Sequence, residues 1–325
     1  MVKVSVYCLV YNHAKYLRSA LDGFVNQKTD FDYEVIVHDD ASTDESSKII
    51  REYETNYPNI IKGIYQTVNQ YSLGIDIVEK FILPKLQGDY IAVCEGDDYW
   101  IDEHKLQKQY DFLETHPEYI ACVHNTIKKD LWQKKDFVMF NQESSSILNL
   151  QDVIKGGSCC FQTSSLFYRI KYHKEKIVKE VSKYNAPFGD YQKAILLSLL
   201  GKIYYIKETM SVYRYGTSGS FTVKTGQSIE KQVMVYKKML NLLEVINCAT
   251  NYNYSDVFEE QILIVKYLID QDIGNYSKLT QKPYDKIFSR KNFKYKLMIY
   301  ILSYLGDIGK YLVKIRRLIK YRDTN

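Results

Sequence analysis

Apolar and polar residues change period repeatedly along the first 126 residues. Short apolar runs, typical of buried strands, occupy residues 2–10, 33–38, 60–65, 90–94 and 119–125. Between them, apolar residues recur every three or four positions, as on one face of a helix; such faces include Leu17, Ala20, Leu21 and Phe24, then Ile49, Ile50, Tyr53 and Tyr57, and the segments 74–86 and 102–115. This alternation predicts an α/β fold with a mostly parallel, Rossmann-like central sheet flanked by helices.

The start of the second helix carries its own signal. Ser42-Thr43-Asp44-Glu45 has the spacing of a capping box, in which a serine hydroxyl accepts a free helix N–H and a glutamate reaches back. We therefore expect the helix to begin directly after Ser42.

The pattern loosens after residue 127. Residues 161–168 and 203–215 look like strands, with a helix at 191–200 between them. Beyond residue 225 the spacing is helical throughout, at 229–243, at 257–273 and in a last basic segment from residue 292. We expect an α/β domain over 1–222 and a helical C-terminal region over 223–325.

Polar residues follow the predicted strands at the point where each strand ends. They are Asn12, Asp39-Asp40, Asn69 and the acidic run Glu95-Gly96-Asp97-Asp98. In open parallel sheets ligands bind beyond the carboxyl ends of the strands, so these side chains are expected to meet at one edge. That convergence predicts a functional site.

The acidic run favours a bound cation. Clustered carboxylates repel each other, and hard ions such as Mg²⁺ and Mn²⁺ prefer all-oxygen surroundings that include substrate phosphates. Gly96 allows a sharp turn and close approach of a ligand. The alternative is a solvated turn that caps the helix after Asp102. No GxGxxG follows the first strand and no GxxxxGK[ST] occurs, so a glycine-rich phosphate loop is not supported.

Charge changes the view of the C-terminal region. The chain carries +5 overall, but residues 291–325 hold nine Lys and Arg and two Asp, a net charge of +7, which leaves −2 for the rest. Leu305, Ile308, Tyr311 and their neighbours repeat at helical spacing among these cations. The segment fits a basic amphipathic helix or helix pair at an anionic membrane surface. The alternative is a helix that packs on the protein and leaves a solvated basic face.

Localisation follows from features near the start and from the cysteines. The first residues lack a secretory signal, and no run of about 18 apolar residues is present to span a bilayer. The six cysteines form no CxxC pair; Cys8, Cys94 and Cys122 lie in strand-like runs, while Cys159, Cys160 and Cys248 do not. Buried reduced thiols are expected, with zinc ligands or disulfides as the alternative. The chain is therefore expected in the cytoplasm, peripheral on the inner face of the cell membrane.

The motifs in order resemble those of one enzyme family. Cys8-Leu9-Val10-Tyr11-Asn12, His38-Asp39-Asp40-Ala41-Ser42-Thr43-Asp44 and Glu95-Gly96-Asp97-Asp98-Tyr99-Trp100 are similar to the VxxYN, DDGSTD and DxDD motifs of family-2 inverting glycosyltransferases with the GT-A fold. The similarity is strong over about residues 2–126. It continues more weakly through Thr163–Ser165, Gly189-Asp190 and Val212-Tyr213-Arg214 to about residue 222.

The resemblance implies roles for individual residues. Val10, Tyr11, Asn12, Asp39, Asp40 and Asn69 would bind the nucleotide sugar, with Glu95 and Asp98 in support; Asp97 and Asp98 would hold Mn²⁺ or Mg²⁺; Trp100, Thr163, Ser164 and Arg214 would lie near the acceptor. Asp190 would be the catalytic base that deprotonates the acceptor hydroxyl. Its bland alternative is the N-cap of the following helix.

Three positions depart from the family pattern. Ala14 stands where the family usually has Glu, Glu95 replaces the first Asp of DxDD, and Gly216 stands where a metal-binding His is common. The last change leaves the metal one protein ligand short. His13, His104 and His124 are available in principle, although each is more typical of a surface or supporting residue.

The combined expectation is an inverting glycosyltransferase of the bacterial surface-polysaccharide type. It would move a sugar, UDP-linked by expectation, onto a carbohydrate acceptor such as a lipid-linked intermediate, at a membrane reached through residues 291–325, without nucleic acid as a partner. One alternative is a sugar nucleotidyltransferase, which would show a glycine-rich loop after the first strand. The other is a catalytically inactive nucleotide-sugar-binding subunit of a membrane polysaccharide assembly complex.

Overall fold

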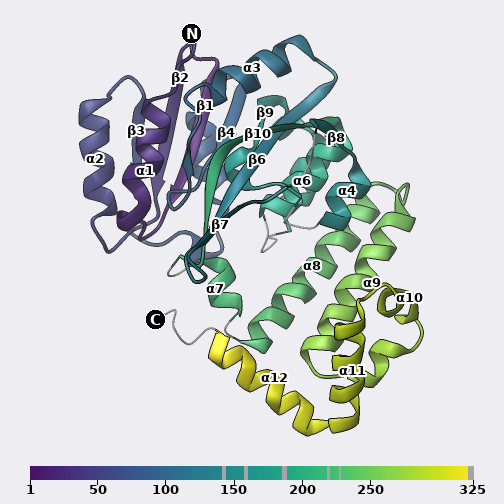
Figure 1. The fold of residues 1–325 in the computed structure, drawn as a ribbon. Coiled ribbons are helices and arrows are strands. Elements are labelled where there is room, and N and C mark those ends of the chain that lie inside the picture. The colour runs from purple at the N-terminus through teal and green to yellow at the C-terminus, as the bar shows by residue number, and fades with distance from the viewer. Residues whose placement is uncertain (141–143, 157–159, 185–188, 218–219, 227, 321–325) are drawn as a thin grey trace. The chain divides into compact units, whose positions relative to one another are not determined.

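The computed structural model describes residues 1–325 except 141–143, 157–159, 185–188, 218–219, 227 and 321–325 (Figure 1). Its contacts divide the chain into two compact units. The first comprises Met1–Lys179 and Asp190–Tyr215, and the second comprises Glu180–Gly189 and Gly216–Asn325. The domain boundary expected at residue 222 stays a prediction. The division of the chain by its contacts passes to the second unit at Gly216.

One mixed sheet forms the centre of the first unit. In the described residues its order is β3-β2-β1-β4-β9-β6-β10-β5, with β7 beside β6 and β8 beside β10. The bounds are β1 Val4–Val10, β2 Tyr33–Asp39, β3 Ile61–Tyr65, β4 Tyr90–Val93, β5 Tyr99–Trp100, β6 Tyr119–Asp130, β7 Lys135–Val138, β8 Ser146–Leu148, β9 Phe167–Arg169 and β10 Lys202–Tyr215. The expected α/β class is confirmed.

Parallel pairing covers the strands that the sequence identified first. β1 pairs in parallel with β2 and β4, β2 pairs in parallel with β3, and β6 pairs in parallel with β10. The register places Val10 opposite Asp39, so β1 and β2 end at the same edge. The short strands β5, β7, β8 and β9 pair antiparallel, and β5, β7 and β8 carried too few apolar residues to be predicted.

Helices pack on both faces because their apolar stripes match the buried sheet. α1 (Ala14–Val25) buries the predicted stripe of Leu17, Ala20, Leu21 and Phe24. Figure 1 shows α1 and α2 (Ser46–Asn56) beside β1, β2 and β3. The remaining helices of the first unit are α3 Lys105–Thr115, α4 Leu150–Gly156, the 3-10 helices Thr163–Ser165 and Ile170–Lys174, and most of α6 Gly189–Leu200, while α5 Lys176–Val181 ends in the second unit.

One predicted element is wrong in kind, and a second is confirmed only over its last residues. Residues 74–86 form no α-helix; a 3-10 turn at Tyr71–Leu73, a π-helical turn at Val78–Ile82 and a 3-10 turn at Leu83–Lys85 occupy that region. Gly74, at a φ of 73°, ends the first turn, and Pro84 lacks the N–H that a regular helix needs. The strand predicted at 161–168 is confined to β9 and its flank, because Ser165 instead bonds back to Gln162 through both its N–H and its hydroxyl.

The buried thiols follow the prediction in part. Cys8, Cys94 and Cys122 are free and buried in the first unit. Cys160 is half-buried and Cys248 is exposed, neither forms a disulfide within the described residues, and Cys159 lies outside those residues.

The second unit is helical, as expected for the C-terminal region. Its elements are α7 Phe221–Gly226, α8 Ile229–Ala249, α9 Ser255–Asp272, the 3-10 helix Tyr276–Thr280, α10 Asp285–Ser289, α11 Phe293–Leu305 and α12 Asp307–Lys320. A second core gathers Tyr267, Tyr276, Leu279, Tyr284, Phe288, Ile299 and Leu302. No helix in the described part of the chain combines the length and apolarity needed to cross a membrane.

Candidate functional site

The end of β1 is joined to the loop after β2 by side chain–backbone hydrogen bonds. Asn12 adopts a left-handed backbone with a φ of 57°, and its Oδ1 accepts the N–H of Thr43 at 2.7 Å. The Asn12 N–H donates to the Ser42 hydroxyl at 2.9 Å, and the Ala14 N–H donates to Asp44 at 2.9 Å. Asn12 is thus placed at the sheet edge, as predicted from its position, and it also holds the two loops together.

These bonds overturn the predicted capping box. The Ser42 hydroxyl serves Asn12 rather than a helix N–H, and α2 begins only at Ser46. Glu45, at the N-cap, makes no capping bond and pairs with Lys48 at 2.8 Å. Ser42 and Glu45 have the spacing of a capping box, but the Ser42 hydroxyl accepts the N–H of Asn12, which is 30 residues away in the chain.

Asp39 and Asp40 are both buried at this edge but have different partners. Asp39 accepts the N–H of Ser42 at 3.1 Å and the hydroxyl of Ser47. Asp40 accepts two N–H groups with its carboxylate, from Gln70 at 2.7 Å and Tyr71 at 3.0 Å. Such charge-assisted bonds fix a loop strongly. Asp40 therefore anchors the segment after β3.

Asn69 belongs to the same anchor. Its Nδ2 donates to the backbone oxygen of Asp40 at 3.1 Å, and its Oδ1 accepts the N–H of Ser72 at 2.7 Å. The structure brings together Asp40 and Asn69, which were predicted separately as donor contacts. Beside them at the edge lie Val10, which is buried, and Tyr11, which is exposed.

The acidic run follows β4, and a backbone hydrogen bond holds it against β1. Gly96 donates its N–H to the backbone oxygen of Leu9 at 3.1 Å, which draws the run against the end of β1. A Cβ added to Gly96 would lie 2.9 Å from both His13 Nδ1 and Val10 Cγ2. Glycine is required here by close approach rather than by backbone angle.

Arg214 supports the run from β10. Its backbone N–H donates to Asp98 Oδ1 at 2.9 Å, its guanidinium donates to the backbone oxygen of Asp97 at 2.7 Å, and it lies 4.2 Å from the centre of the Tyr99 ring. Sequence reasoning placed Arg214 at the acceptor. In the structure Arg214 instead bonds to the acidic run, and its guanidinium also lies 5.1 Å from the centre of the Tyr16 ring.

Burial and mutual repulsion raise the pKa of two carboxyl groups in the acidic run. Burial raises the pKa of Asp98 well above its ordinary value, and the neighbouring charges of Asp97 and Glu95 raise it further. Glu95 keeps an exposed surface, yet desolvation of its carboxyl, followed by repulsion from Asp97 and Asp190, raises its pKa to about 8. A cation placed among these groups would relieve both effects.

The described residues do not hold a metal by themselves. Within the described ranges no three His, Cys, Asp or Glu side chains gather as a metal-binding group. Mg²⁺ and Mn²⁺ sites commonly use one or two carboxylates and complete their shell with water and substrate phosphates. Asp97, which is half-buried, and Asp98 fit that arrangement.

Asp190 and Lys193 approach the acidic run from α6. Asp190 Oδ1 accepts the N–H of Tyr191 at 2.7 Å, and partial desolvation raises the pKa of Asp190 although the residue keeps an exposed surface. Lys193, one turn later, donates to the Tyr7 hydroxyl at 2.7 Å, and its charge lowers the pKa of both Asp190 and Glu95. Sequence reasoning missed Lys193; its spacing of three from Asp190 on a helix was the available signal.

Trp100 and Ser164 form a buried contact. The Trp100 indole N–H donates to the backbone oxygen of Ser164 at 2.8 Å, and its ring meets Phe24 edge-on at 4.8 Å. The Ser164 hydroxyl continues to Ser211 at 3.0 Å. Thr163 begins the same 3-10 turn. Their acceptor roles stay predictions, and Trp100 contributes core contacts.

The histidines lie at different distances from the acids. His13 Nδ1 is buried without a hydrogen-bond partner among the described residues; burial lowers the pKa of His13, and the charges of Asp97, Asp44 and Asp39 oppose that shift. His104 is exposed at the start of α3, and His124 is buried in the sheet with Nδ1 on the Asn125 backbone oxygen. Gly216, with a φ of 90°, has a backbone that a histidine would adopt only with strain.

Comparison with known proteins identifies relatives of this chain. The chain is 34% identical over 218 residues to an uncharacterised protein of Mycobacterium tuberculosis, covering 66% of this chain and 60% of that one. It is 36% identical over 112 residues to the poly(ribitol-phosphate) beta-glucosyltransferase of Bacillus spizizenii, covering 34% of this chain and 17% of that one. The chain therefore spans less than two thirds of the length of these relatives.

The fold matches that of a solved structure. S. aureus TarS in complex with UDP-GlcNAc superposes with a TM-score of 0.57 at 16% identity, covering 96% of this chain and 90% of that one. The expected GT-A type of fold is thereby confirmed. The model of glycosyl transferase family 2 matches residues 5–175, more than half of the sequence. The chain belongs to glycosyl transferase family 2.

Proposed function

We propose that the protein transfers a sugar from a UDP-sugar to a carbohydrate acceptor with inversion at the anomeric carbon. The observation that carries the proposal is the meeting of Asp39, the acidic run and Asp190 within one unit whose motifs belong to family 2. The TarS complex, which contains UDP-GlcNAc, supports a uridine donor.

The donor would lie along the edge formed by β1 and β2. Tyr11 offers an exposed ring at the end of β1, and the loop of Asn69, held by Asp40, stands beside it. Asp39 and Asn12 keep the two loops in register and present polar atoms toward the nucleoside. Pre-organisation of this kind lowers the entropic cost of binding.

Asp97 and Asp98 would hold Mn²⁺ or Mg²⁺ together with the donor diphosphate. Such an ion supplies positive charge where the departing diphosphate develops negative charge. Arg214 keeps the carboxylates in place by its bonds to Asp98 and to the Asp97 backbone. Glu95, whose pKa is raised to about 8, would add negative charge beside the same position once a bound cation favours its ionised form.

Asp190 would accept the proton of the acceptor hydroxyl. The acceptor oxygen then forms a bond to the anomeric carbon as the bond from that carbon to the diphosphate oxygen breaks. A carboxylate with a raised pKa is the stronger base, provided that it is ionised at the working pH. Lys193, by lowering that pKa, favours the ionised form of Asp190.

The acceptor is proposed to be a lipid-linked glycan of a bacterial capsule or other cell-surface polysaccharide. The relative from B. spizizenii, named as a poly(ribitol-phosphate) glucosyltransferase, supports a surface-polymer acceptor. The basic segment 291–325 supports work at the cytoplasmic face of the membrane. Residues 321–325 of that segment lie outside the described residues.

A donor screen tests the proposal. The purified full chain, incubated with UDP-sugars and GDP-sugars in the presence of Mn²⁺, should slowly release UDP from one donor. Asp97→Asn and Asp190→Asn should each reduce release by at least about a hundredfold. Asp111→Asn, an exposed acid on α3, is the matched control and should retain the full rate.

The outcomes separate the candidate functions. Full-rate release in both site variants would refute the site assignment. Binding of UDP without turnover of any donor would favour the catalytically inactive subunit. Ala14 and Gly216, which depart from the family pattern, are the residues that support that alternative. Formation of a UDP-sugar from UTP and a sugar phosphate would favour a nucleotidyltransferase, which lacks support because no glycine-rich loop follows β1.

A further inference from the structure

α11 is apolar on two faces, and the second unit covers only one. Ile299 and Leu302 point into the core made by Tyr267, Leu279 and their neighbours. On another face Phe293, Leu297, Tyr300, Ile301 and Tyr304 follow each other at helical spacing. We call these five residues the α11 outer face. Their exposed fractions run from 48% at Leu297 to 92% at Tyr304.

Such a helix calls for a second partner. A helix that is apolar all round is normally buried all round, and a contiguous exposed apolar patch marks an interaction site. Ile308, Tyr311 and Leu312 on α12 are exposed as well, and they extend the apolar surface along the chain. This exposed apolar surface is expected to contact a partner.

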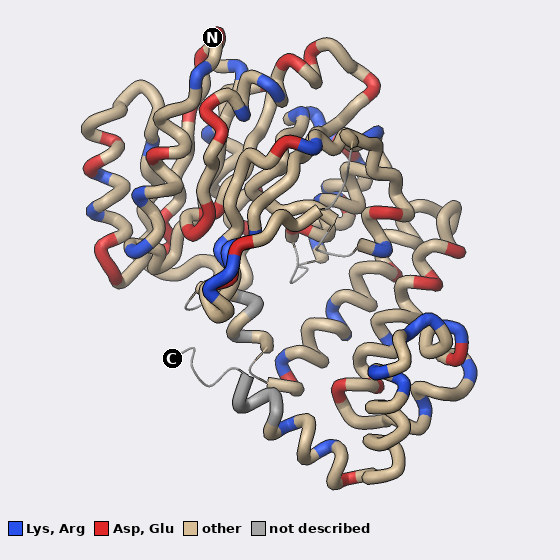
Figure 2. Tube along the Cα trace, in the orientation of Figure 1, with Lys and Arg blue, Asp and Glu red and all other residues tan. Residues whose placement is uncertain are grey.

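Charge near the α11 outer face identifies the partner. Lys294 is exposed on α11, and Lys314 is exposed on α12. Figure 2 shows lysines along both helices and an acidic position at the turn between them, where Asp307 pairs with Lys310 at 2.9 Å. Residues 291–325 carry +7 in total. Aromatic and aliphatic side chains flanked by lysines match the boundary between acyl chains and anionic headgroups.

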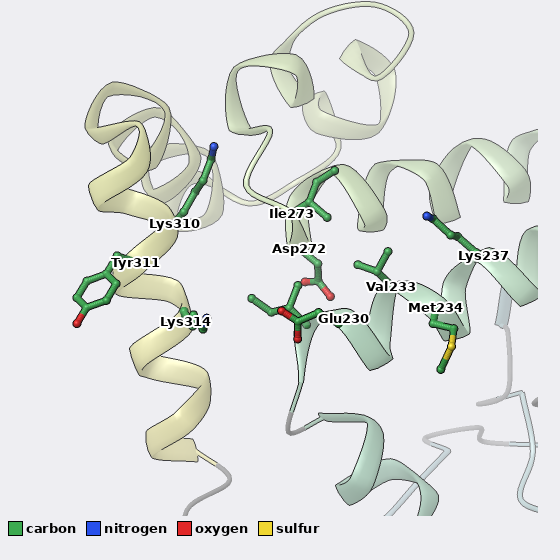
Figure 3. A pocket seen from close by; sticks show the side chains of 10 residues that line it. Glu230, Val233, Met234, Lys237, Asp272, Ile273, Lys310, Tyr311 and Lys314 are labelled. Carbon is green, nitrogen blue, oxygen red and sulfur yellow. The ribbon is translucent and has the colours of Figure 1, made fainter.

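A neighbouring hollow does not account for this charge. It has a volume of about 690 Å³ and lies between the first turns of α8, the end of α9 and α12 (Figure 3). Figure 3 shows the carboxylates of Glu230 and Asp272 turned toward each other and the Tyr311 ring turned away from α8. Lys237, Lys310 and Lys314 also line the hollow, where Glu230 and Asp272 offset most of their charge, whereas Lys294 is not among the residues that line it. A lipid surface would therefore meet the exposed helix face.

We propose that the α11 outer face docks on an anionic lipid bilayer, with its five apolar side chains inserted at the interface and nearby lysines at the headgroups. The inference deepens the membrane contact of the proposed function. It assigns that contact to α11, whereas the sequence pointed to the basic segment as a whole. Binding of this kind needs both apolar area and charge.

Vesicle co-sedimentation of the full chain tests the proposal. Wild-type protein should bind vesicles of phosphatidylglycerol and phosphatidylcholine in equal parts, and added salt should weaken binding to them. The double variant Phe293→Ser, Tyr304→Ser should lower partition by about tenfold or more. Lys294→Gln with Lys314→Gln should lower partition to the anionic vesicles and leave weak binding to pure phosphatidylcholine unchanged.

A matched variant controls for loss of exposed aromatic side chains in general. Phe137→Ser with Tyr254→Ser removes one Phe and one Tyr that are each 43% exposed outside α11 and α12. This control should partition like wild type. Equal partition of wild type and the α11 variant would overturn the proposal, and so would self-association through the α11 outer face that vesicles do not displace.

Donor hydrolysis separates this proposal from the proposed function. UDP release in free solution should be the same in wild type and in all these variants, because none of the substituted residues belongs to the site. Loss of vesicle binding with unchanged UDP release supports the docking face. Absence of UDP release from wild type, together with vesicle binding that needs α11, would refute the proposed activity and leave the docking face standing.

Discussion

Gly96 illustrates what one residue contributes to the site. It lets the acidic run lie against the end of β1, where His13 Nδ1 and Val10 Cγ2 occupy the space that a Cβ would need. Neither neighbour is a flexible chain end in open solvent, because Val10 is buried and His13 Nδ1 is enclosed. Small size at this position therefore sets the distance between the run and the donor edge.

We expect Gly96→Ala to destabilise the fold by about 1–3 kcal/mol, as overpacking does, and to lower kcat/KM for UDP release more than tenfold by displacing Asp97. Thermal unfolding and donor kinetics measure the two effects. Gly189→Ala is the control for stability, since an added Cβ there meets no atom within 4 Å. Unchanged unfolding and kinetics in Gly96→Ala would show that the approach is looser than described.

Lys105 is an unusual buried cation beneath Trp100. Its Nζ donates to Gln109 at 2.6 Å and lies 4.0 Å from the Trp100 ring centre, and no part of the side chain reaches solvent. Burial lowers the pKa of Lys105 to about 7. In the unfolded chain the ordinary pKa applies, so between these values the unfolded state binds more protons than the folded state.

The sign of the pH effect follows from that difference. Below pH 7 both states carry the proton and the cost of burying the charge is fully present; as the pH rises from about 7 toward the ordinary lysine range, the cost disappears. We expect the free energy of unfolding of wild type to rise relative to Lys105→Met over this interval, by at most about 1.4 kcal/mol per pH unit. Chemical denaturation at several pH values measures it, and parallel pH curves for the two proteins would contradict it.

Helix α6 shows how an element organises chemistry. Its first turn carries Asp190 and its next turn carries Lys193, so one rigid helix presents a carboxylate and a cation together. Tyr7 on β1 holds the lysine, while Glu95 and His173 also lie within its electrostatic reach. Because Asp190 and Lys193 are three residues apart on α6, the hydrogen bond from Lys193 to Tyr7 links the helix that carries the proposed base to the sheet.

We expect Lys193→Met to shift the acidic limb of the kcat/KM profile upward in pH, because loss of the positive charge lets the pKa of Asp190 rise. Lys193→Arg should restore the wild-type limb, whereas a merely structural role would be revealed by lower activity at all pH values with the limb unmoved. The readout is UDP release from about pH 5 to about pH 9.

At the scale of the whole molecule, the residues of the candidate site and those of the proposed docking face belong to different units. The first unit carries the family motifs and the candidate site, and the second carries the α11 outer face and the basic segment. If both proposals hold, group transfer belongs to the first unit and surface attachment to the second. Ligands of the site should stabilise the first unit alone.

We expect UDP with Mn²⁺ to raise the unfolding temperature of the full chain, and a chelator to abolish both the shift and UDP release, with recovery when Mn²⁺ or Mg²⁺ is added back. Asp97→Asn should show a reduced shift. Hydrogen exchange locates the effect, and protection by UDP and Mn²⁺ confined to the second unit would contradict the site assignment.

Much of the fold was predictable from the sequence, and the failures share a cause. The buried face of α1 and the strands β1, β2 and β4 were predicted closely because periodicity reports burial directly. The capping box failed because Asn12, far along the chain, took the Ser42 hydroxyl. Lys193 was missed because its spacing from Asp190 indicates only a shared helix face, and its partner Tyr7 lies far away in the sequence.

The sequence by itself determined the fold class, the strand ends on which the polar residues stand, the family motifs and the charge of the C-terminal segment. Each of these depends on residue type and local spacing. Only the tertiary structure decided that Asp40 serves the Asn69 loop, that Arg214 clamps the acidic run, and that α11 keeps an apolar face exposed. These depend on which distant residue reaches a group first, and hydrogen bonds and burial are settled by proximity in space rather than along the chain.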